Sequence, residues 1–289
     1  MLILLFALAI LSFTFQNISF KQFNMGYMKN PASYFLFTSI FFAMVTVMYL
    51  AVGIDTSLFD LGVAALGLMF AVSFITAIYL FMKAMENGPL GLSFLFFSAG
   101  IIVPILFGII VYNEPAPLHR FAGLVLLFIA FFISTMGKSG GKMSKTWVIY
   151  ILLGSLFNGI IGLSLKLIPS VMPDYAITEF LFLGFGQGAI IAFIVGLFLM
   201  KRYKMPVSHF RRASFIFVAV LAAVTTAGGN YIMARLSLLV SALVQFPVVS
   251  GSLVITSIIT SRLVYKEEVT KQHYTAIAIG LAAIVMLSM

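Results

Sequence analysis

Long apolar stretches, separated by short polar segments, run through the whole chain of 289 residues. Each is uncharged or nearly so, the shortest has 17 residues, and most have more than 20. Because about 20 helical residues cross the roughly 30 Å hydrocarbon core of a bilayer, this pattern predicts transmembrane helices rather than one large buried core. Ten such stretches are present: residues 1–20, 30–54, 61–82, 87–113, 121–137, 146–165, 180–200, 213–234, 236–261 and 272–289.

The composition favours the same class, an all-α integral membrane protein with ten transmembrane helices. Hydrophobic residues make up 62% of the chain and charged residues 9%, whereas a soluble globular chain has about 25% charged residues. The first stretch lacks a basic leading segment and a small-x-small cleavage site before Gln16. We therefore expect it to be a membrane span rather than a cleavable signal peptide. The chain has no cysteine, which excludes disulfides, thiolate chemistry and cysteine-based metal sites.

The basic residues fall mostly in alternate connections between the predicted spans, and this predicts an orientation. Of the 17 Lys and Arg residues, 14 lie in odd-numbered connections, and the other three are Arg120, Lys166 and Arg235. The positive-inside rule places the odd connections in the cytoplasm. We therefore expect both termini on the extracytoplasmic side of the cell (inner) membrane. The net charge of +9 is interpreted as this topology signal and not as a surface for nucleic acid.

The chain also contains an internal repeat. The segment Ile18–Lys21 (ISFK) is matched 145 residues later by Leu163–Lys166 (LSLK), and both close an apolar stretch. A unit with an odd number of spans is inverted in its second copy, and inverted copies are typical of alternating-access transporters. Further matches follow in the same order: Tyr79 with Tyr231, Lys83 with Arg235, Ser98 with Ser250, and Val111–Glu114 with Val264–Glu267.

The repeat predicts a division of the chain into two inverted five-helix units, a 5+5 arrangement. The first unit is residues 1–137, the second is residues 146–289, and residues 138–145 (KSGGKMSK) are a basic, flexible linker. The connections between spans fit an inversion. Residues 53–62 contain two aspartates and no basic residue, whereas the equivalent connection in the second copy, residues 201–212, contains five basic residues.

These features, taken in order, resemble the drug/metabolite transporter superfamily in its ten-span EamA-like form. The third span ends in Tyr79–Pro89 (YLFMKAMENGP), and a tight turn leads to a fourth span with Ser98 and Pro104. That span closes at Val111–Pro115 (VYNEP), which is similar to the family's "lgE" ending. Gly123 follows in the fifth span, and Glu267 repeats the glutamate ending in the second copy. The resemblance covers nearly the whole chain, through loose motifs.

The resemblance implies a 5+5 inverted-repeat helical fold with a central substrate cavity. It leaves the substrate open, because the superfamily moves amino acids, nucleobases, sugars, choline, drugs and nucleotide sugars. The chain departs from the family in one respect. Members are often described with both termini inside the cell, whereas the charges here predict termini outside.

Polar side chains within the spans are the candidate substrate ligands, because such groups are costly in a bilayer and tend to face a cavity or a partner helix. Gln187 and Gln245 lie near the middle of their expected spans. For both we give equal weight to binding a polar substrate and to a hydrogen bond with a neighbouring helix. The full set of candidates is Gln16, Asn17, Asn158, Gln187, Asn230 and Gln245, with Tyr79 and Tyr231 as cavity walls.

A second group of residues is suited to gating or coupling. Glu179 and Glu86 are suited to taking up a proton, binding a cationic group or pairing with a nearby lysine. Lys83 and Arg235 are repeat mates at span ends, and Arg235, on the side poor in basic residues, either extends to the outer interface or helps an anionic group to enter. Pro104 and Pro247 each remove an intrahelical hydrogen bond and mark candidate gating kinks.

No carboxylate lies in the middle of a span. The small multidrug-resistance relatives use a central glutamate in the first span to exchange protons for cations. The equivalent stretch here, residues 1–20, has none. This argues against proton-coupled export of cationic drugs and favours an uncoupled carrier, an exchanger or coupling through Glu179.

Enzyme motifs are absent from the sequence. His119, His209 and His273 have no metal-ligand spacing, and there is no phosphate-binding Gly-Lys-Ser/Thr loop. We therefore expect no enzyme activity, cofactor or metal. The predicted function is a secondary-active or facilitative transporter, monomeric or homodimeric, that moves a small organic metabolite or drug-like solute by alternating access through a central cavity. The alternative is a lipid or lipid-linked sugar flippase, or a subunit of one, which would have a lateral opening between helices.

Overall fold

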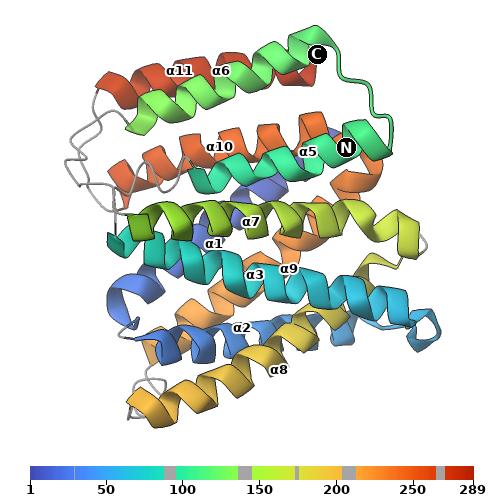
Figure 1. Ribbon diagram of the computed structural model, residues 1–289, viewed down its shortest axis with the longest axis vertical. Helices are drawn as coiled ribbons and strands as arrows, with labels where there is room; N and C mark the ends of the chain where they lie inside the picture. The colour runs from blue at the N-terminus through green and yellow to red at the C-terminus, as the bar shows by residue number, and fades with distance from the viewer. Residues whose placement is uncertain (29, 88–95, 136–144, 173–175, 204–212, 265–270) are drawn as a thin grey trace. The chain divides into compact units, whose positions relative to one another are not determined.

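The computed structural model describes residues 1–28, 30–87, 96–135, 145–172, 176–203, 213–264 and 271–289 (Figure 1). Within these ranges the regular structure is entirely helical. The long helices are α1 (Leu2–Gly26), α2 (Pro31–Val52), α3 (Leu61–Asn87), α7 (Lys145–Val171), α8 (Ile177–Tyr203) and α9 (Ala213–Leu239). The others are α5 (Ile102–Val111), α6 (Leu118–Thr135), α10 (Ala242–Leu263) and α11 (Lys271–Ser288), with 3₁₀ turns at Thr56–Leu58 and Ala99–Ile101.

Each of the ten predicted apolar stretches contains helical residues in the described chain. Among the described residues, six helices are long and apolar enough to cross a membrane: Leu2–Gly26, Pro31–Val52, Leu61–Ala84, Lys145–Ile168, Ile177–Tyr203 and Ala213–Leu239. Four further apolar helices are shorter: Phe96–Val111, Leu118–Ala130, Ala242–Thr256 and Tyr274–Leu287. The chain is therefore a helical protein with several membrane-spanning segments.

Short polar side chains set the helix starts. Asn30 caps α2, because its side-chain oxygen accepts a hydrogen bond from the Ser33 N–H at 3.0 Å, and Pro31 occupies the first helical position. Asp60 does the same for α3 by accepting from the Val63 N–H at 2.8 Å. These caps confirm the polar breaks that separate the first three predicted spans.

The described chain divides into two compact units, and each takes one piece from each half of the sequence. Unit 1 consists of Met1–Ile75 and Leu167–Leu238, and unit 2 of Thr76–Lys166 and Leu239–Met289. These units are a different division from the two sequence repeats. The predicted linker lies outside the described residues except for Lys145, which begins α7.

In unit 1, α2 packs along α8, and the two are equivalent spans of the predicted sequence repeats (Figure 1). Three glycines of α8 show the direction of packing. Gly186 lies against Thr46, Gly188 against Phe42 and Gly196 against Leu36, so the two helices run antiparallel. An aromatic cluster surrounds this contact: Phe42, Phe70, Phe74 and Phe185 pack edge-on or tilted at centroid distances of 4.9 to 5.9 Å.

Unit 2 repeats this arrangement with another pair of equivalent spans. Here α6 packs along α11, and α5 also packs on α10. Gly123 lies against Leu287 and Gly280 lies nearest to Ala130, so α6 and α11 are antiparallel as well. Two copies related by inversion must run antiparallel wherever a helix meets its own counterpart. Packing within both units therefore agrees with the order of the sequence repeat.

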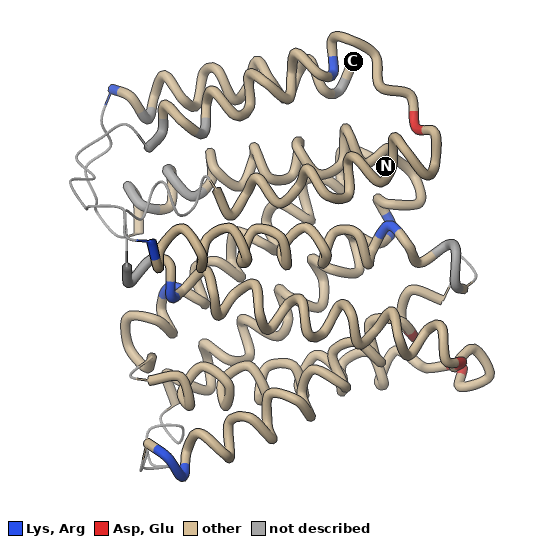
Figure 2. The backbone as a smooth tube through the Cα atoms, in the orientation of Figure 1, with Lys and Arg blue, Asp and Glu red and all other residues tan. Residues whose placement is uncertain are grey.

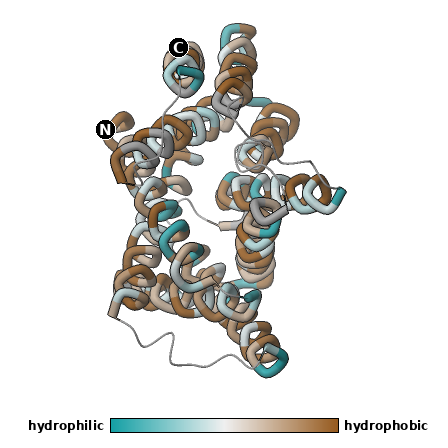
Figure 3. The backbone as a smooth tube through the Cα atoms, turned by 90° about the vertical axis from the view of Figure 1, so that its left-hand side faces the viewer, coloured by the Kyte–Doolittle hydropathy of each residue, from teal (hydrophilic) through white to brown (hydrophobic). Residues whose placement is uncertain are grey.

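The outer faces of the helices are strongly apolar, as expected for contact with lipid. On α8, Ile190, Ile194 and Phe198 are 62, 62 and 69% exposed and follow one another at four-residue spacing. Figure 3 shows hydrophobic turns along the length of the helices, with hydrophilic residues between them. Exposed apolar faces of this extent are unfavourable in water and are satisfied by a bilayer.

Candidate functional site

A cluster of neutral polar side chains joins α1 to α9 inside unit 1. The Gln16 amide Nε2 donates to the Thr226 hydroxyl at 2.5 Å, and the Asn230 Nδ2 donates to the Thr226 carbonyl at 2.9 Å. All three residues are buried. From α2, the Tyr49 hydroxyl donates to the Ala227 carbonyl at 2.7 Å. We call Gln16, Tyr49, Thr226 and Asn230 the polar cluster. Gln16 and Asn230, two of the candidate substrate residues, therefore lie together in the interior of unit 1.

Glycines allow α1 and α9 to approach closely enough for this bridge. A Cβ on Gly229 would lie 3.0 Å from the Phe13 ring, and one on Gly228 would lie 3.6 Å from the Ser12 hydroxyl. The sequence pattern Gly228-Gly229 therefore serves close helix packing in this unit. Asn17, next to Gln16, is exposed and takes no part in the cluster.

Gln187 bridges α8 and α3 in unit 1. Its Nε2 donates to the Ala64 carbonyl at 3.2 Å, and its Oε1 is buried without a hydrogen-bond partner. Gly67 makes room for it, since a Cβ there would lie 3.3 Å from the Gln187 Oε1. One end of this amide thus serves helix packing, and the other offers a free acceptor.

The acidic and basic residues of unit 1 lie at opposite ends of α8. Glu179 is in the first turn, and Lys201 and Arg202 are in the last (Figure 2). The Glu179 carboxylate is buried and accepts the Asp55 N–H at 3.1 Å, so it fixes the loop between α2 and α3. Hydrogen bonds from the Ser57 side chain and backbone lower the pKa of the exposed Asp55 carboxyl, which keeps this end negative at neutral pH.

The remaining predicted residues of the eighth and third spans lie near helix ends. Arg235 is exposed, and its guanidinium is 5.9 Å from the ring centroid of the half-buried Tyr231. This contact agrees with the interfacial interpretation of Arg235. Tyr79 and Lys83 are half-buried in the unit 2 part of α3. The side chain of Glu86 lies outside the described residues.

The prediction that Gln245 lies in the middle of its span is wrong. The structure continues α9 to Leu239 and begins α10 at Ala242, with Ser241 as its N-cap. Gln245 is therefore in the first turn of α10, where its N–H donates to the Ser241 carbonyl at 2.9 Å. The error came from ending the eighth span at a charge, because Arg235 does not break the helix. Gln245 is fully buried.

Pro104 and Asn158 both contribute to helix junctions in unit 2. A Cβ on Gly162 of α7 would lie 2.9 Å from the Phe246 ring and 3.0 Å from Pro104, so α5, α7 and α10 meet closely there. Asn158 donates to the Phe97 carbonyl at 3.2 Å and ties α7 to the start of the fourth span. Pro247 lies inside α10, as the sequence predicts.

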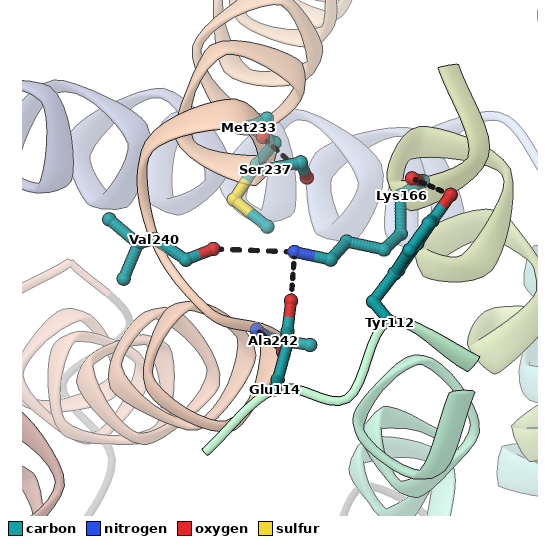
Figure 4. A network of polar contacts seen from close by, with 7 residues as sticks. All are labelled: Tyr112, Glu114, Lys166, Met233, Ser237, Val240 and Ala242. Atoms are coloured by element: carbon teal, nitrogen blue, oxygen red, sulfur yellow. Dashed lines mark hydrogen bonds and ion pairs between the residues drawn. The ribbon is translucent and has the colours of Figure 1, made fainter. Parts of the chain in front are cut away.

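One turn beyond Gly162, unit 2 holds a buried ion pair that the sequence reasoning did not identify. The Lys166 ammonium contacts the Glu114 carboxylate, and their side chains are only 8 and 11% exposed (Figure 4). The second carboxylate oxygen accepts the Ala242 N–H at 2.7 Å, at the start of α10. Lys166 also donates to the Val240 carbonyl at 3.4 Å. We call Tyr112, Glu114 and Lys166, with the start of α10, the charged cluster.

Tyr112 completes the charged cluster. Its hydroxyl donates to the Lys166 carbonyl at 3.3 Å, and its ring centroid is 5.9 Å from the Lys166 ammonium. Gly108 provides space for the carboxylate, since a Cβ there would lie 2.5 Å from the Glu114 Oε2. The sequence contained one signal for this pair. Both residues follow apolar stretches on the side that the charge count leaves poor in basic residues.

Comparison with known proteins establishes the fold and leaves the family open. No family model matches the chain, and no curated protein matches it. Among solved structures, a crystal structure of a protein with 12% sequence identity matches 98% of this chain and 94% of its own, at a TM-score of 0.76. The chain therefore shares its overall helical fold with that protein.

Proposed function

We propose that this protein is a secondary-active or facilitative transporter of a small organic solute, with ten spans in two inverted five-helix repeats, and that it is related to the drug/metabolite transporter superfamily. One observation carries the proposal. In both compact units, equivalent helices of the sequence repeat pack antiparallel against each other, α2 on α8 and α6 on α11. This is the packing expected of an inverted duplication, the architecture used for alternating access.

The proposed orientation places the termini outside the cytoplasm of the cell membrane. Its support is the charge separation along unit 1, with Glu179 and Asp55 at one end of α8 and Lys201 and Arg202 at the other. By the positive-inside rule the basic end is cytoplasmic. The N-terminus of α1 then lies with the acidic end, because α1 and α2 are consecutive spans and α2 ends at the loop containing Asp55.

Flux into proteoliposomes tests the proposal. The purified chain is reconstituted, and uptake is measured for amino acids, organic acids, sugars, nucleobases and amphipathic cations, with preloaded unlabelled solute to detect exchange. We expect saturable, competable flux of one class that is accelerated by solute on the opposite side. Movement of labelled lipid between leaflets without solute flux would favour a flippase instead, and neither activity would contradict the proposal.

Site variants sharpen this test. Gln187→Ala and Gln245→Ala should each reduce the flux at least fivefold while the protein still inserts and purifies as the wild type does. Gln272→Ala is the matched control, because Gln272 is an exposed glutamine outside the candidate site and should leave the flux unchanged. If both glutamine variants transport normally, the proposed substrate residues are wrong even if transport itself is established.

A further inference from the structure

In the charged cluster, a lysine cation and a backbone N–H both contact one carboxylate, which belongs to the protein's own Glu114. The Glu114 carboxylate forms an ion pair with the Lys166 ammonium. It also accepts a hydrogen bond from the backbone N–H of Ala242, the first residue of α10. A helix N-terminus carries a partial positive charge and unpaired N–H groups, so it adds to the attraction of a nearby cation for an anion. These two contacts are the ones that a bound carboxylate or phosphate oxygen makes.

The residues that hold the carboxylate and the residue that supplies it differ in their local structure. Lys166 is in α7 and Ala242 begins α10, so both are fixed by regular helices. Glu114 is on the non-helical connection between α5 and α6, one residue after Asn113, whose φ is +50°. Glu114 thus belongs to neither of the two helices that hold its carboxylate.

One more polar group at the start of α10 makes no hydrogen bond with the Glu114 carboxylate. The Ser241 hydroxyl oxygen is buried and has no hydrogen-bond partner, although Ser241 is the N-cap of α10. An N-cap serine normally accepts a hydrogen bond from the first turn of its helix. A buried polar atom without a partner is unfavourable, and Ser241 directly precedes Ala242, whose N–H binds the Glu114 carboxylate.

We propose that Lys166 and the N-terminus of α10 form a binding site for the carboxylate or phosphate group of a small organic anion, and that Glu114 fills this site when the anion is absent. Exchange of one anion for another avoids leaving the buried Lys166 cation unpaired, which would cost several kcal/mol. Gln245 is fully buried in the first turn of the same helix and is our candidate for contact with the rest of such a solute. The identification of this anion as the transported solute rests on the proposed function, whereas its binding does not.

The experiment measures anion binding by the full chain in detergent. Acetate and inorganic phosphate are titrated at constant ionic strength, and the thermal unfolding midpoint is followed through the fluorescence of Trp147, the single tryptophan. Glu114→Gln removes the competing charge and keeps the shape. We expect it to bind acetate, phosphate or both with a dissociation constant at least tenfold below that of the wild type. Acetate without phosphate identifies a carboxylate site, and the reverse identifies a phosphate site.

A second variant displaces the Glu114 carboxylate from the site without deleting its charge. Gly108→Ala places a Cβ 2.5 Å from the Glu114 Oε2 and 2.9 Å from its Cδ, so the carboxylate has to move away. It should therefore raise anion affinity in the same direction as Glu114→Gln. If Glu114→Gln does not fold, Gly108→Ala alone decides the question.

Two controls separate this site from general charge effects. Adding Lys166→Met to either variant should abolish the gain in affinity, whereas Lys201→Met, which removes an exposed cation, should leave it intact. Equal anion stabilisation with and without Lys166, or no stabilisation of the Glu114→Gln and Gly108→Ala proteins, would overturn the proposal. Because binding is measured in detergent, this result is independent of flux in proteoliposomes, so failure of either claim is recognisable by itself.

Discussion

The polar cluster of unit 1 and the charged cluster of unit 2 bridge helices by different means. Gln16, Thr226 and Asn230 are neutral; one hydrogen bond, from Gln16 to Thr226, joins α1 to α9, and Asn230 bonds to Thr226 within α9. Glu114 and Lys166 carry opposite charges and connect α7, the segment after α5 and the start of α10. Neutral side-chain hydrogen bonds between membrane helices contribute about 0.6 kcal/mol on average, whereas breaking one partner of a buried ion pair costs about 3–5 kcal/mol.

This difference suggests a division of roles. The polar cluster is weak enough for a substrate to compete with, and its loss should hardly affect folding. Breaking the buried ion pair of the charged cluster costs more free energy. Glu114 or Lys166 should therefore leave the pair only when another charged group takes its place. The predictions below perturb the two clusters and the helix contacts of the two units, beginning with the largest expected effect.

Loss of one charge in unit 2 should be the most destabilising change. Lys166→Met or Glu114→Ala alone should lower the free energy of unfolding by about 3–5 kcal/mol, because the partner is left buried without a counter-charge. The double variant should be more stable than either single one. Denaturant titration in detergent, followed by Trp147 fluorescence, measures all three. If the double variant loses the sum of the single effects, the pair is not coupled.

A glycine-to-alanine substitution should lower stability more at the α2–α8 contact of unit 1 than at the α6–α11 contact of unit 2. Gly188→Ala in α8 places a Cβ 2.6 Å from the Phe42 ring and should cost about 1–3 kcal/mol of stability through overpacking. Gly280→Ala in α11 is the matched control, since its nearest neighbour would be 3.8 Å away. It should be neutral or stabilise by up to about 1 kcal/mol, because alanine favours a helix. Equal losses would show that α2 and α8 are not packed as described.

The polar cluster should show the smallest effect on stability. Gln16→Leu and Thr226→Val should each cost about 0.6 kcal/mol and at most about 1.7 kcal/mol. A double-mutant cycle in the same unfolding assay should give a coupling of this size. Asn17→Leu, at an exposed neighbouring position, should change nothing. A loss as large as that of Lys166→Met would remove the distinction between the two clusters.

Helices were predictable from the sequence, because an apolar run of about 20 residues has few alternatives in a bilayer. Some helix ends were not. The sequence signalled the start of α2 through Asn30 and Pro31. It obscured the junction of α9 and α10, because Arg235 looked like the end of a span and the actual break at Ser241 has no charge.

The two clusters illustrate the same limit at the level of the site. Gln16 and Asn230 could be named as candidates from the cost of polar groups in a bilayer, but their shared contact with Thr226 could not be predicted. The pairing of Glu114 with Lys166 depends on how α5, α7 and α10 meet at Gly108 and Gly162, which no local pattern reveals. The repeat gave the order of equivalent spans but not that they pack against one another.

Side-specific labelling of equivalent connections tests the inversion of the two repeats most directly. The chain has no cysteine, so Thr56→Cys after α2 and Tyr203→Cys at the end of α8 each supply a single reactive thiol at an exposed position. On intact cells a membrane-impermeant maleimide should label Thr56→Cys at once and Tyr203→Cys only after permeabilisation. Labelling of both positions from the same side would contradict an inverted duplication.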